Sequence, residues 1–319
     1  MNEPSTIDYQ ANYKVLPSST QQVGIQSPEV VNLSRNVIIT GDDFEHVDCD
    51  PSLPEAIPGE QTSLDGCRCA DFPRTKCTVG LHTMQKGGGV QKIHNTRVEK
   101  CGQRGIEGKY CLHFHLLGEC PNCSFENNAI EYSHQRGIII HGTHLSTVKG
   151  NVLHNVRGAG IYIEDGNEMF NTLSYNVVFC PYPFGHSVYH GCTVPGTSNR
   201  LSDTSDNQSN FFSLAGSNNF IGNRGASGFN GMFLIETGKG RGSAANQVCQ
   251  SAARLGRFEG NTFHSNGRFG TYTLGNNYPK VTDQSTTNNG FNVDQTLCEG
   301  FDENGDTRGL PGAFISHTD

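Results

Sequence analysis

The segment FENNAIEYSHQRG, residues 125–137, is followed by a second version, VKGNVLHNVRGAG at 148–160, and a third, FEGNTFHSNGRFG at 258–270. In all three, an apolar residue comes first, Gly or Asn third, Asn fourth, an apolar residue sixth and Gly thirteenth. Repetition at roughly 20–25 residues is typical of solenoid proteins. Three further segments fit the template in part: IHNTRVEKCGQRG (93–105), TLSYNVVF (172–179) and NNFIGNRG (218–225).

A unit of this length cannot bury its own apolar face, but stacked copies can, with adjacent strands about 4.8 Å apart. The fourth-position Asn of each coil can hydrogen-bond to its equivalents above and below, which predicts a ladder of amides. We expect the thirteenth-position Gly to occupy a corner that needs a positive φ. The repeat therefore predicts an all-β fold, a parallel β-helix, and the handedness of parallel crossovers favours a right-handed one. A leucine-rich solenoid has a similar period, but its Leu lattice is missing.

The repeat also predicts how the chain is divided. We expect the β-helix to span residues 36–275, after an extended segment at 1–35 and before a polar tail or cap at 276–319. Three stretches rich in Cys, Pro, Ser or Gly should leave the coils as a disulfide-pinned insertion and two loops, at 44–77, 180–217 and 238–256.

Composition excludes several classes of protein. The 319 residues include 39 Gly and no Trp, and only 34% are hydrophobic, which suits many short strands and turns rather than a helical bundle. The net charge of −8 disfavours nucleic acid and anionic membranes as partners. The sequence contains no apolar run of about 18 residues, so we expect no membrane span.

The 12 cysteines favour an oxidising compartment. Cys67-x-Cys69 with Cys120-Pro-Asn-Cys123 could instead form a zinc site, but their separation is long for one, so a disulfide framework is the preferred interpretation. Sequons for N-glycosylation agree with a secreted, extracellular protein; they lie at Asn32, Asn122 and Asn207.

The repeat predicts a column of polar side chains. Counting thirteen residues beyond the fourth-position Asn of three coils leads to His141, Glu164 and Glu236. Equivalent residues of stacked strands lie about 5 Å apart and point the same way. The column could alternatively be a solvated stripe, or could face the interior of the coil.

Earlier coils extend the same column. The coil before His141 places His113 or His115 there, and His82 ends an apolar run one coil further back. Imidazoles with a carboxylate suit zinc or a similar divalent transition metal, whereas calcium prefers oxygen ligands throughout. The predicted metal ligands are His82, His113, His115, His141 and Glu164.

Carboxylates along the column allow a second kind of chemistry, because paired acids can hydrolyse glycosidic bonds. Asp165 and Glu236 are the predicted catalytic residues. Asp165 alternates to the opposite face from Glu164, so the two are not both metal ligands unless the strand ends at that point, and each is the alternative to the other.

Six segments together resemble the β-helix region of the cell-migration-inducing hyaluronidases, their transmembrane relative and the fibrocystin-like proteins. They are RNVIITG (35–41), VGLHTMQ (79–85), EKCGQRGIEGKYCLHFHLLG (99–118), HQRGIIIHGTH (134–144), GAGIYIEDG (158–166) and SNNFIGNRGASGFNGMFLIE (217–236). The resemblance implies an extracellular right-handed β-helix and, in the hyaluronidase branch, binding and depolymerisation of hyaluronan. Its ordered motifs HFHLLG, HGTH and EDG match His113, His115, His141, His144, Glu164 and Asp165.

Two functions stay open, because the fibrocystin-like members share these motifs without a known hyaluronidase activity. The first is a metal-dependent glycan-binding protein or depolymerase acting on a hyaluronan-like polysaccharide. The second is a non-catalytic structural or adhesive glycoprotein that assembles with other extracellular proteins, and whose metal only stabilises the fold.

Overall fold

The computed structural model describes residues 30–41, 80–102, 108–181, 209–234, 241–242 and 256–273. The coordinates divide into two units, Met1–Asn32 and Leu33–Asp319, and all the strands described belong to the second. Among the described residues, no helix is long and apolar enough to cross a membrane.

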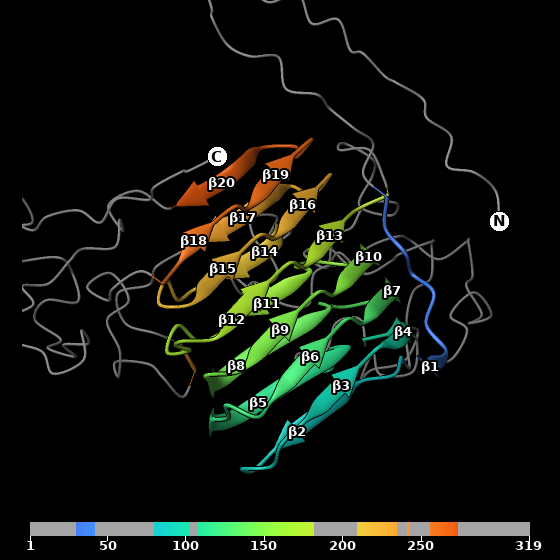
Figure 1. Cartoon of the computed structure of the whole chain (residues 1–319), viewed down its shortest axis with the longest axis vertical. Coiled ribbons are helices and arrows are strands. Elements are labelled where there is room, and N and C mark those ends of the chain that lie inside the picture. Colours follow the sequence, from blue (N-terminus) through green and yellow to red (C-terminus); the bar gives the residue numbers. More distant parts are fainter. Residues whose placement is uncertain are drawn as a thin grey trace, which may run out of the picture. The chain divides into compact units, whose positions relative to one another are not determined.

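The described strands form three sheets, and within each sheet neighbouring strands are parallel (Figure 1). Sheet A contains β1 (Val37–Thr40), β4 (Thr96–Cys101), β7 (Ala129–Ser133), β10 (Val152–Val156), β13 (Val177–Phe179), β16 (Arg224–Ala226) and β19 (Thr262–His264). Sheet B contains β2 (Thr83–Lys86), β5 (Leu112–Glu119), β8 (Ile138–His144), β11 (Ile161–Ile163), β14 (Ser209–Ser213), β17 (Asn230–Leu234) and β20 (Phe269–Thr273). Sheet C contains β3 (Lys92–His94), β6 (Ser124–Glu126), β9 (Thr147–Lys149), β12 (Thr172–Ser174), β15 (Asn219–Ile221) and β18 (Phe258–Glu259).

Each coil supplies one strand to each sheet. The chain passes from β6 in sheet C through β7 in sheet A to β8 in sheet B, and then begins the next coil at β9. Every strand pairs in parallel with its equivalent in the next coil, as β7 does with β10 and β8 does with β11. The predicted parallel β-helix is confirmed.

The predicted ladder of amides is confirmed as well. Each rung donates from Nδ2 to Oδ1 of the next Asn at 2.9–3.0 Å, and its backbone N–H donates to the same oxygen. Each Nδ2 also donates to a backbone carbonyl of the coil before, which satisfies the buried amide. The rungs are Asn128, Asn151, Asn176, Asn223 and Asn261.

Left-handed corners occur at other template positions than the one predicted. The residue before each rung, and before Thr96 at the equivalent position, has φ between 53° and 65°: these are Asn95, Asn127, Gly150, Tyr175, Gly222 and Gly260. A second corner recurs at the eighth position with φ between 52° and 57°, at Lys100, Tyr132, Asn155, Ser227 and Ser265.

The prediction of a positive φ at the thirteenth-position Gly is therefore wrong. Gly137 and Gly160 are not among the residues with positive φ. A Cβ on Gly160 would lie 2.3 Å from Cγ1 of Val178, and one on Gly137 would lie 2.6 Å from Cδ2 of Leu153. These glycines are required because the side chains of sheet A pack against their backbone.

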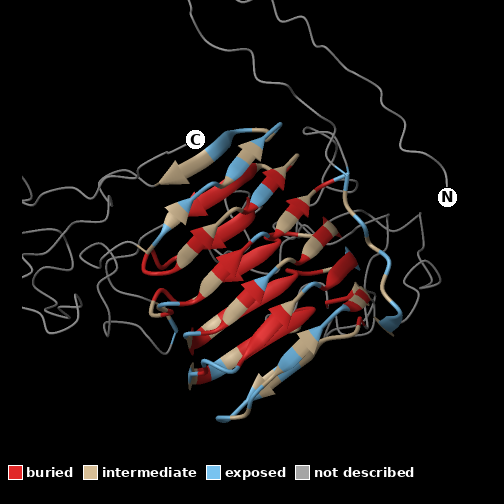
Figure 2. Cartoon of the chain, viewed as in Figure 1, coloured by how far each residue is buried: buried red, intermediate tan, exposed pale blue. Residues whose placement is uncertain are grey.

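Both faces of sheet B are buried over its middle strands (Figure 2). Alternate residues of β8 point to opposite faces, so Ile138 and Ile140 enter the main core inside the coils, whereas Ile139 joins a second apolar cluster outside them. The outer cluster stacks aromatic rings along the sheet, with Tyr162 and Phe212 4.6 Å apart. Its buried members are Tyr110, Ile139, Ala159, Tyr162, Phe212, Leu214 and Phe233.

Three of the predicted boundaries can be compared with the structure. The first strand begins at Val37 and the last described strand ends at Thr273, within the predicted span of 36–275. The predicted loop 180–217 is wrong at its end, because Ser209–Ser213 forms β14 and buries Phe211 in the core. The insertion 44–77 and the tail 276–319 lie outside the described residues.

Disulfide bonds join Cys101 to Cys111 and Cys120 to Cys123. The second bond shows that the Cys-Pro-Asn-Cys motif is not half of a zinc site, so the disulfide interpretation is confirmed at these positions. Cys67 and Cys69 lie outside the described residues.

Candidate metal centre

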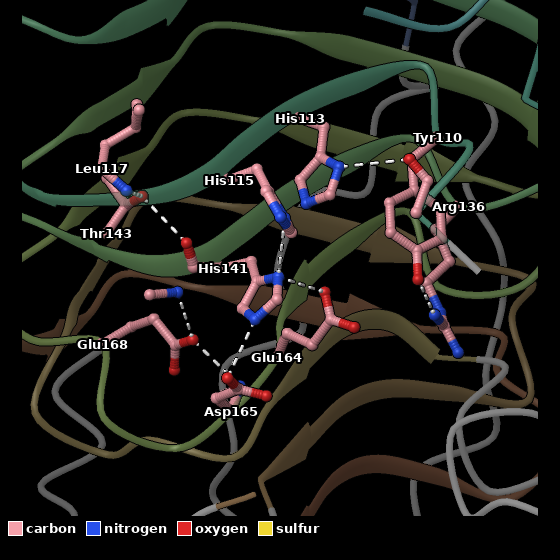
Figure 3. A network of polar contacts seen from close by, with 12 residues as sticks. Tyr110, His113, His115, Leu117, Arg136, His141, Thr143, Glu164, Asp165 and Glu168 are labelled. Carbon is pink, nitrogen blue, oxygen red and sulfur yellow. Dashed lines mark hydrogen bonds and ion pairs between the residues drawn. The ribbon is translucent and has the colours of Figure 1, made fainter. Parts of the chain in front are cut away.

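His113, His115 and His141 come together beside β5 and β8 of sheet B (Figure 3). His113 pairs with Ile139 and its ring contacts Tyr110, and both belong to the outer cluster, so the histidines lie on the outer face of the sheet. In β5 and β8, His115 pairs with His141. Glu164 directly follows β11, and its backbone N–H donates to the carbonyl of Ile140, which places it beside His141 in the next coil. The register of β5 shifts directly after His115, so the regular column ends at this level.

Three imidazoles face one another at this point. Nδ1 of His115 lies 3.1 Å from Nδ1 of His141. One ring nitrogen from each of His113, His115 and His141 lies within 4.8 Å of the others. Two nitrogens bound to one zinc ion at about 2.1 Å are about 3.4 Å apart, so small ring rotations would bring all three to one ion.

His113 is the most buried of the three and presents a nitrogen to the others. Its side chain is 0% exposed, and its Nδ1 lies 3.3 Å from the carbonyl oxygen of Gly108. A carbonyl only accepts, so Nδ1 carries the proton and Nε2 carries the lone pair. Nε2 is buried and has no hydrogen-bond partner among the described residues. A buried imidazole nitrogen with an unused lone pair is a suitable metal ligand.

The electrostatics keep two of the imidazoles neutral. Burial, together with the neighbouring His115 and His141, lowers the pKa of His113 to about 3. Burial, His141 and Lys86 also lower the pKa of His115. Neutral imidazoles are the forms that bind metals.

His141 differs because carboxylates surround it. Burial acts to lower the pKa of His141, but the hydrogen bond to Asp165 and the charges of Glu164 and Glu168 raise it above the ordinary value. Its Nε2–H donates to Oδ2 of Asp165 at 2.9 Å, and its Nδ1 lies 3.6 Å from Oε2 of Glu164. A metal ion at Nδ1 would replace a proton when that proton is present.

Both acids can reach one histidine because β11 ends at Ile163. Past the end of the strand, alternation no longer holds, and Glu164 and Asp165 contact opposite nitrogens of the same ring. The strand therefore ends where the two acids begin, which is the condition stated for both of them to be ligands. Asp165 is 4% exposed, which places this predicted catalytic residue behind His141.

The structure corrects the expected position of His82. β2 begins one residue later, and it is Lys86 that pairs with His115 at the level of the column. His82 instead contacts Nζ of Lys109 through Nε2 at 3.0 Å. The apolar run before His82 suggested that a strand ended there, whereas the strand begins after it. The other predicted catalytic residue, Glu236, lies outside the described residues.

Sequence reasoning missed Glu168 altogether. This residue lies in the turn after β11 and is 0% exposed. It accepts three backbone hydrogen bonds, one from Gly142 in β8 and two from Asp165 and Gly166 in the turn. Burial raises the pKa of Glu168 to about 7, although those hydrogen bonds act to lower it. No repeat position marks it. The single available signal is an acid two residues after the turn glycine, Gly166.

Sheet strands, imidazoles and carboxylates together define the class of protein: a parallel β-helix domain that carries a candidate transition-metal centre on one outer face. The sequence model of the family described as CEMIP beta-helix matches residues 78–271. The match covers more than half of the 319 residues, and the chain belongs to this family.

Individual proteins are also similar to this chain. Fibrocystin-L of Mus musculus is 29% identical over 272 residues, which cover 81% of this chain and 6% of the relative. Protein rliB of Dictyostelium discoideum is 32% identical over 195 residues, which cover 60% of this chain and 17% of the relative. A G8 domain-containing protein of the same organism is 27% identical over 243 residues, covering 72% of this chain and 17% of the relative.

The chain therefore spans less than a fifth of the length of these relatives. The resemblance inferred from the motifs is confirmed at the level of the family and of fibrocystin-L. Disulfide bonds inside the coils agree with an extracellular-type domain.

Proposed function

We propose that this domain binds a divalent transition metal ion, zinc or a similar one, and that the ion serves an extracellular, polysaccharide-directed function. The proposed ligands are His113, His115, His141 and Glu164. The observation that supports this most strongly is the grouping of three imidazole nitrogens within 4.8 Å, one of them buried without a hydrogen-bond partner in the described structure.

The arrangement behind the ligands supports the same proposal. Histidines that bind metals commonly donate their second ring N–H to a carboxylate, which fixes the tautomer and the orientation of the ring. His141 has such a partner in Asp165, and His113 donates from Nδ1 to the carbonyl of Gly108. We therefore assign Asp165 the role of orienting His141, in place of direct action on a substrate.

Glycan chemistry is supported by the family and by the charges at the site. An ion with an open position can polarise a substrate oxygen or activate water for attack on a glycosidic bond. His115 and His141 are half-buried, so the ion would be reachable from their side. Lys86, exposed at the same level of the sheet, adds a positive charge that suits an acidic polysaccharide such as hyaluronan.

The structural or adhesive function remains the second proposal, and one observation favours it. The proposed ligands come from three consecutive coils, at β5, β8 and the turn after β11. An ion held there would crosslink the coils whether or not it took part in a reaction. In that case the glycoprotein would serve as a rod or filament subunit that assembles with other extracellular proteins.

The two proposals are separated by incubating the purified chain with hyaluronan, chondroitin and a neutral glucan, with and without EDTA. Depolymerisation that EDTA and His141→Ala both abolish supports the first proposal. Glycan chains of unchanged length, with EDTA lowering only the melting temperature, support the second. An exposed histidine outside the centre provides the matched control, since His264→Ala should leave metal content and activity unchanged. Full metal occupancy in His141→Ala would refute the ligand set.

Secretion and N-glycosylation are part of the same proposal. Asn32 and Asn122 are exposed, as a glycan attachment site must be, and Asn207 lies outside the described residues. Peptide mass spectrometry of the protein secreted from eukaryotic cells, before and after N-glycanase treatment, tests each sequon. Unmodified Asn122 in the secreted protein would remove that site from the proposal.

A further inference from the structure

The turn that carries Glu164 and Asp165 is held by a single buried carboxylate. Oε1 of Glu168 accepts hydrogen bonds from the backbone N–H groups of Gly142 and Asp165, both at 2.9 Å. Its Oε2 accepts from the N–H of Gly166 at 2.8 Å. Figure 3 shows this side chain pointing toward the turn beside Asp165.

The three N–H groups belong to two different coils. Gly142 directly follows His141 in β8, whereas Asp165 and Gly166 follow Glu164 at the end of β11. A carboxylate that binds both segments fixes their separation. It therefore fixes how far the acids of one coil lie from the histidine of the coil before.

Further contacts secure the same turn without reaching the metal ligands. The carbonyl of Glu168 accepts from Nδ2 of Asn218 at 2.9 Å. The backbone N–H of Met169 donates to Nδ1 of His144 at 3.2 Å, which places His144 in a supporting role outside the ligand cluster. The peptide group that follows Glu168 is thus anchored through both its carbonyl and its N–H.

A carboxylate is an unusual choice for a position with 0% exposure, because burying an ionisable group is costly. The ladder corners of the described coils use Asn, which carries no charge. One Asn side chain offers a single acceptor oxygen, whereas a carboxylate has two and can accept from three N–H groups at once.

We propose that Glu168 is a positioning residue of the metal centre: it holds the Glu164–Asp165 turn against His141. With the turn held, Asp165 stays within hydrogen-bond distance of Nε2 of His141, and Glu164 stays on the side of Nδ1. This inference rests on the proposed metal function and adds a residue to it that binds neither metal nor substrate.

The test is a titration of the full metal-free chain with Co²⁺, followed by visible absorption, which reports both affinity and coordination geometry. We expect Glu168→Ala to weaken Co²⁺ binding by about 10–100-fold, the usual effect of removing an outer partner of a ligand, and to shift the absorption bands. Glu168→Gln should recover part of the affinity, because its remaining oxygen can still accept from Gly142 and Asp165.

A ladder variant, Asn223→Ala, is the matched control because Asn223 is buried and its hydrogen bonds lie in the ladder, away from the centre. It should lower the melting temperature while leaving the Co²⁺ affinity within about twofold and the spectrum unchanged. Equal loss of affinity in Glu168→Ala and this control, or an unchanged spectrum in Glu168→Ala, would overturn the positioning role. Absence of Co²⁺ binding by the unmodified chain would instead overturn the proposed function itself.

Discussion

Acidifying the metal-free protein should destabilise it through His113. This imidazole is 0% exposed and donates to the carbonyl of Gly108, and burial with its histidine neighbours lowers its pKa from 6.5 to about 3. In the unfolded chain His113 is therefore protonated below pH 6.5, whereas in the folded chain it is protonated only below about pH 3. Because the folded pKa is the lower one, the stabilisation is complete above pH 6.5 and is lost as the pH falls.

The size of the effect follows from the two pKa values. The difference of about 3.5 pH units corresponds to about 5 kcal/mol when the loss is complete. At pH 4.5 the unfolded chain is fully protonated at this position and the folded chain is not, so about 3 kcal/mol should already be lost. Most domains have only about 5–15 kcal/mol to lose.

The assay is urea unfolding of the EDTA-treated chain at pH 7.5 and pH 4.5, compared with His113→Phe, which keeps an aromatic ring but cannot titrate. The variant should lose about 3 kcal/mol less on acidification than the unmodified chain. The exposed-site control His264→Gln should follow the unmodified chain. If His113→Phe and the unmodified chain lose the same free energy, the neutral buried imidazole inferred here is wrong.

Three further outcomes are expected, each measured by urea unfolding. Asn151→Ala removes a rung that is 0% exposed and should lower the free energy of unfolding by about 3–5 kcal/mol, because it leaves buried hydrogen-bonding groups without a partner. The same change at the half-buried rung Asn261 should cost less. Gly160→Ala should cost about 1–3 kcal/mol by overpacking. Gly260→Asn should stay within about 0.5 kcal/mol, because Gly260 has a left-handed φ, a Cβ there would come no closer than 3.9 Å to its neighbours, and Asn occupies equivalent corners. Burial raises the pKa of Glu168 from 4.5 to about 7, so its contribution to the free energy of unfolding is lost as the pH rises from 4.5 through 7. Glu168→Gln cannot ionise and should lose about 3 kcal/mol less over this range than the unmodified chain. If the free energy of unfolding falls equally with pH in both proteins, the raised pKa is wrong.

The repeat alone was enough to predict the fold and the ladder. Every fourth-position Asn of the template forms a rung, and where Thr96 replaces Asn its backbone N–H still donates to Asn128. The occurrence of Gly does not by itself reveal backbone conformation, however. Gly occurs both at left-handed corners and at close contacts between coils, and Gly150 and Gly160 look alike in the sequence while serving these different purposes.

The candidate site was predicted in part for a related reason. His115, His141 and Glu164 lie at matching register positions, because the coils that carry them have similar lengths. Counting failed at His82, where the sequence does not show that the strand begins one residue later. It could not detect Glu168, whose importance depends on backbone N–H groups from two coils, and such groups leave no mark on residue type.

Successive rungs of the ladder are separated by 23, 25, 47 and 38 residues, yet they hydrogen-bond with the same geometry. The number of residues between two rungs can therefore differ about twofold while the rungs keep the same contacts. The amide pairs are constant contacts, whereas the length of chain between them varies. New surface segments could be exchanged at these points, in evolution or in the laboratory, while the histidines keep their neighbours.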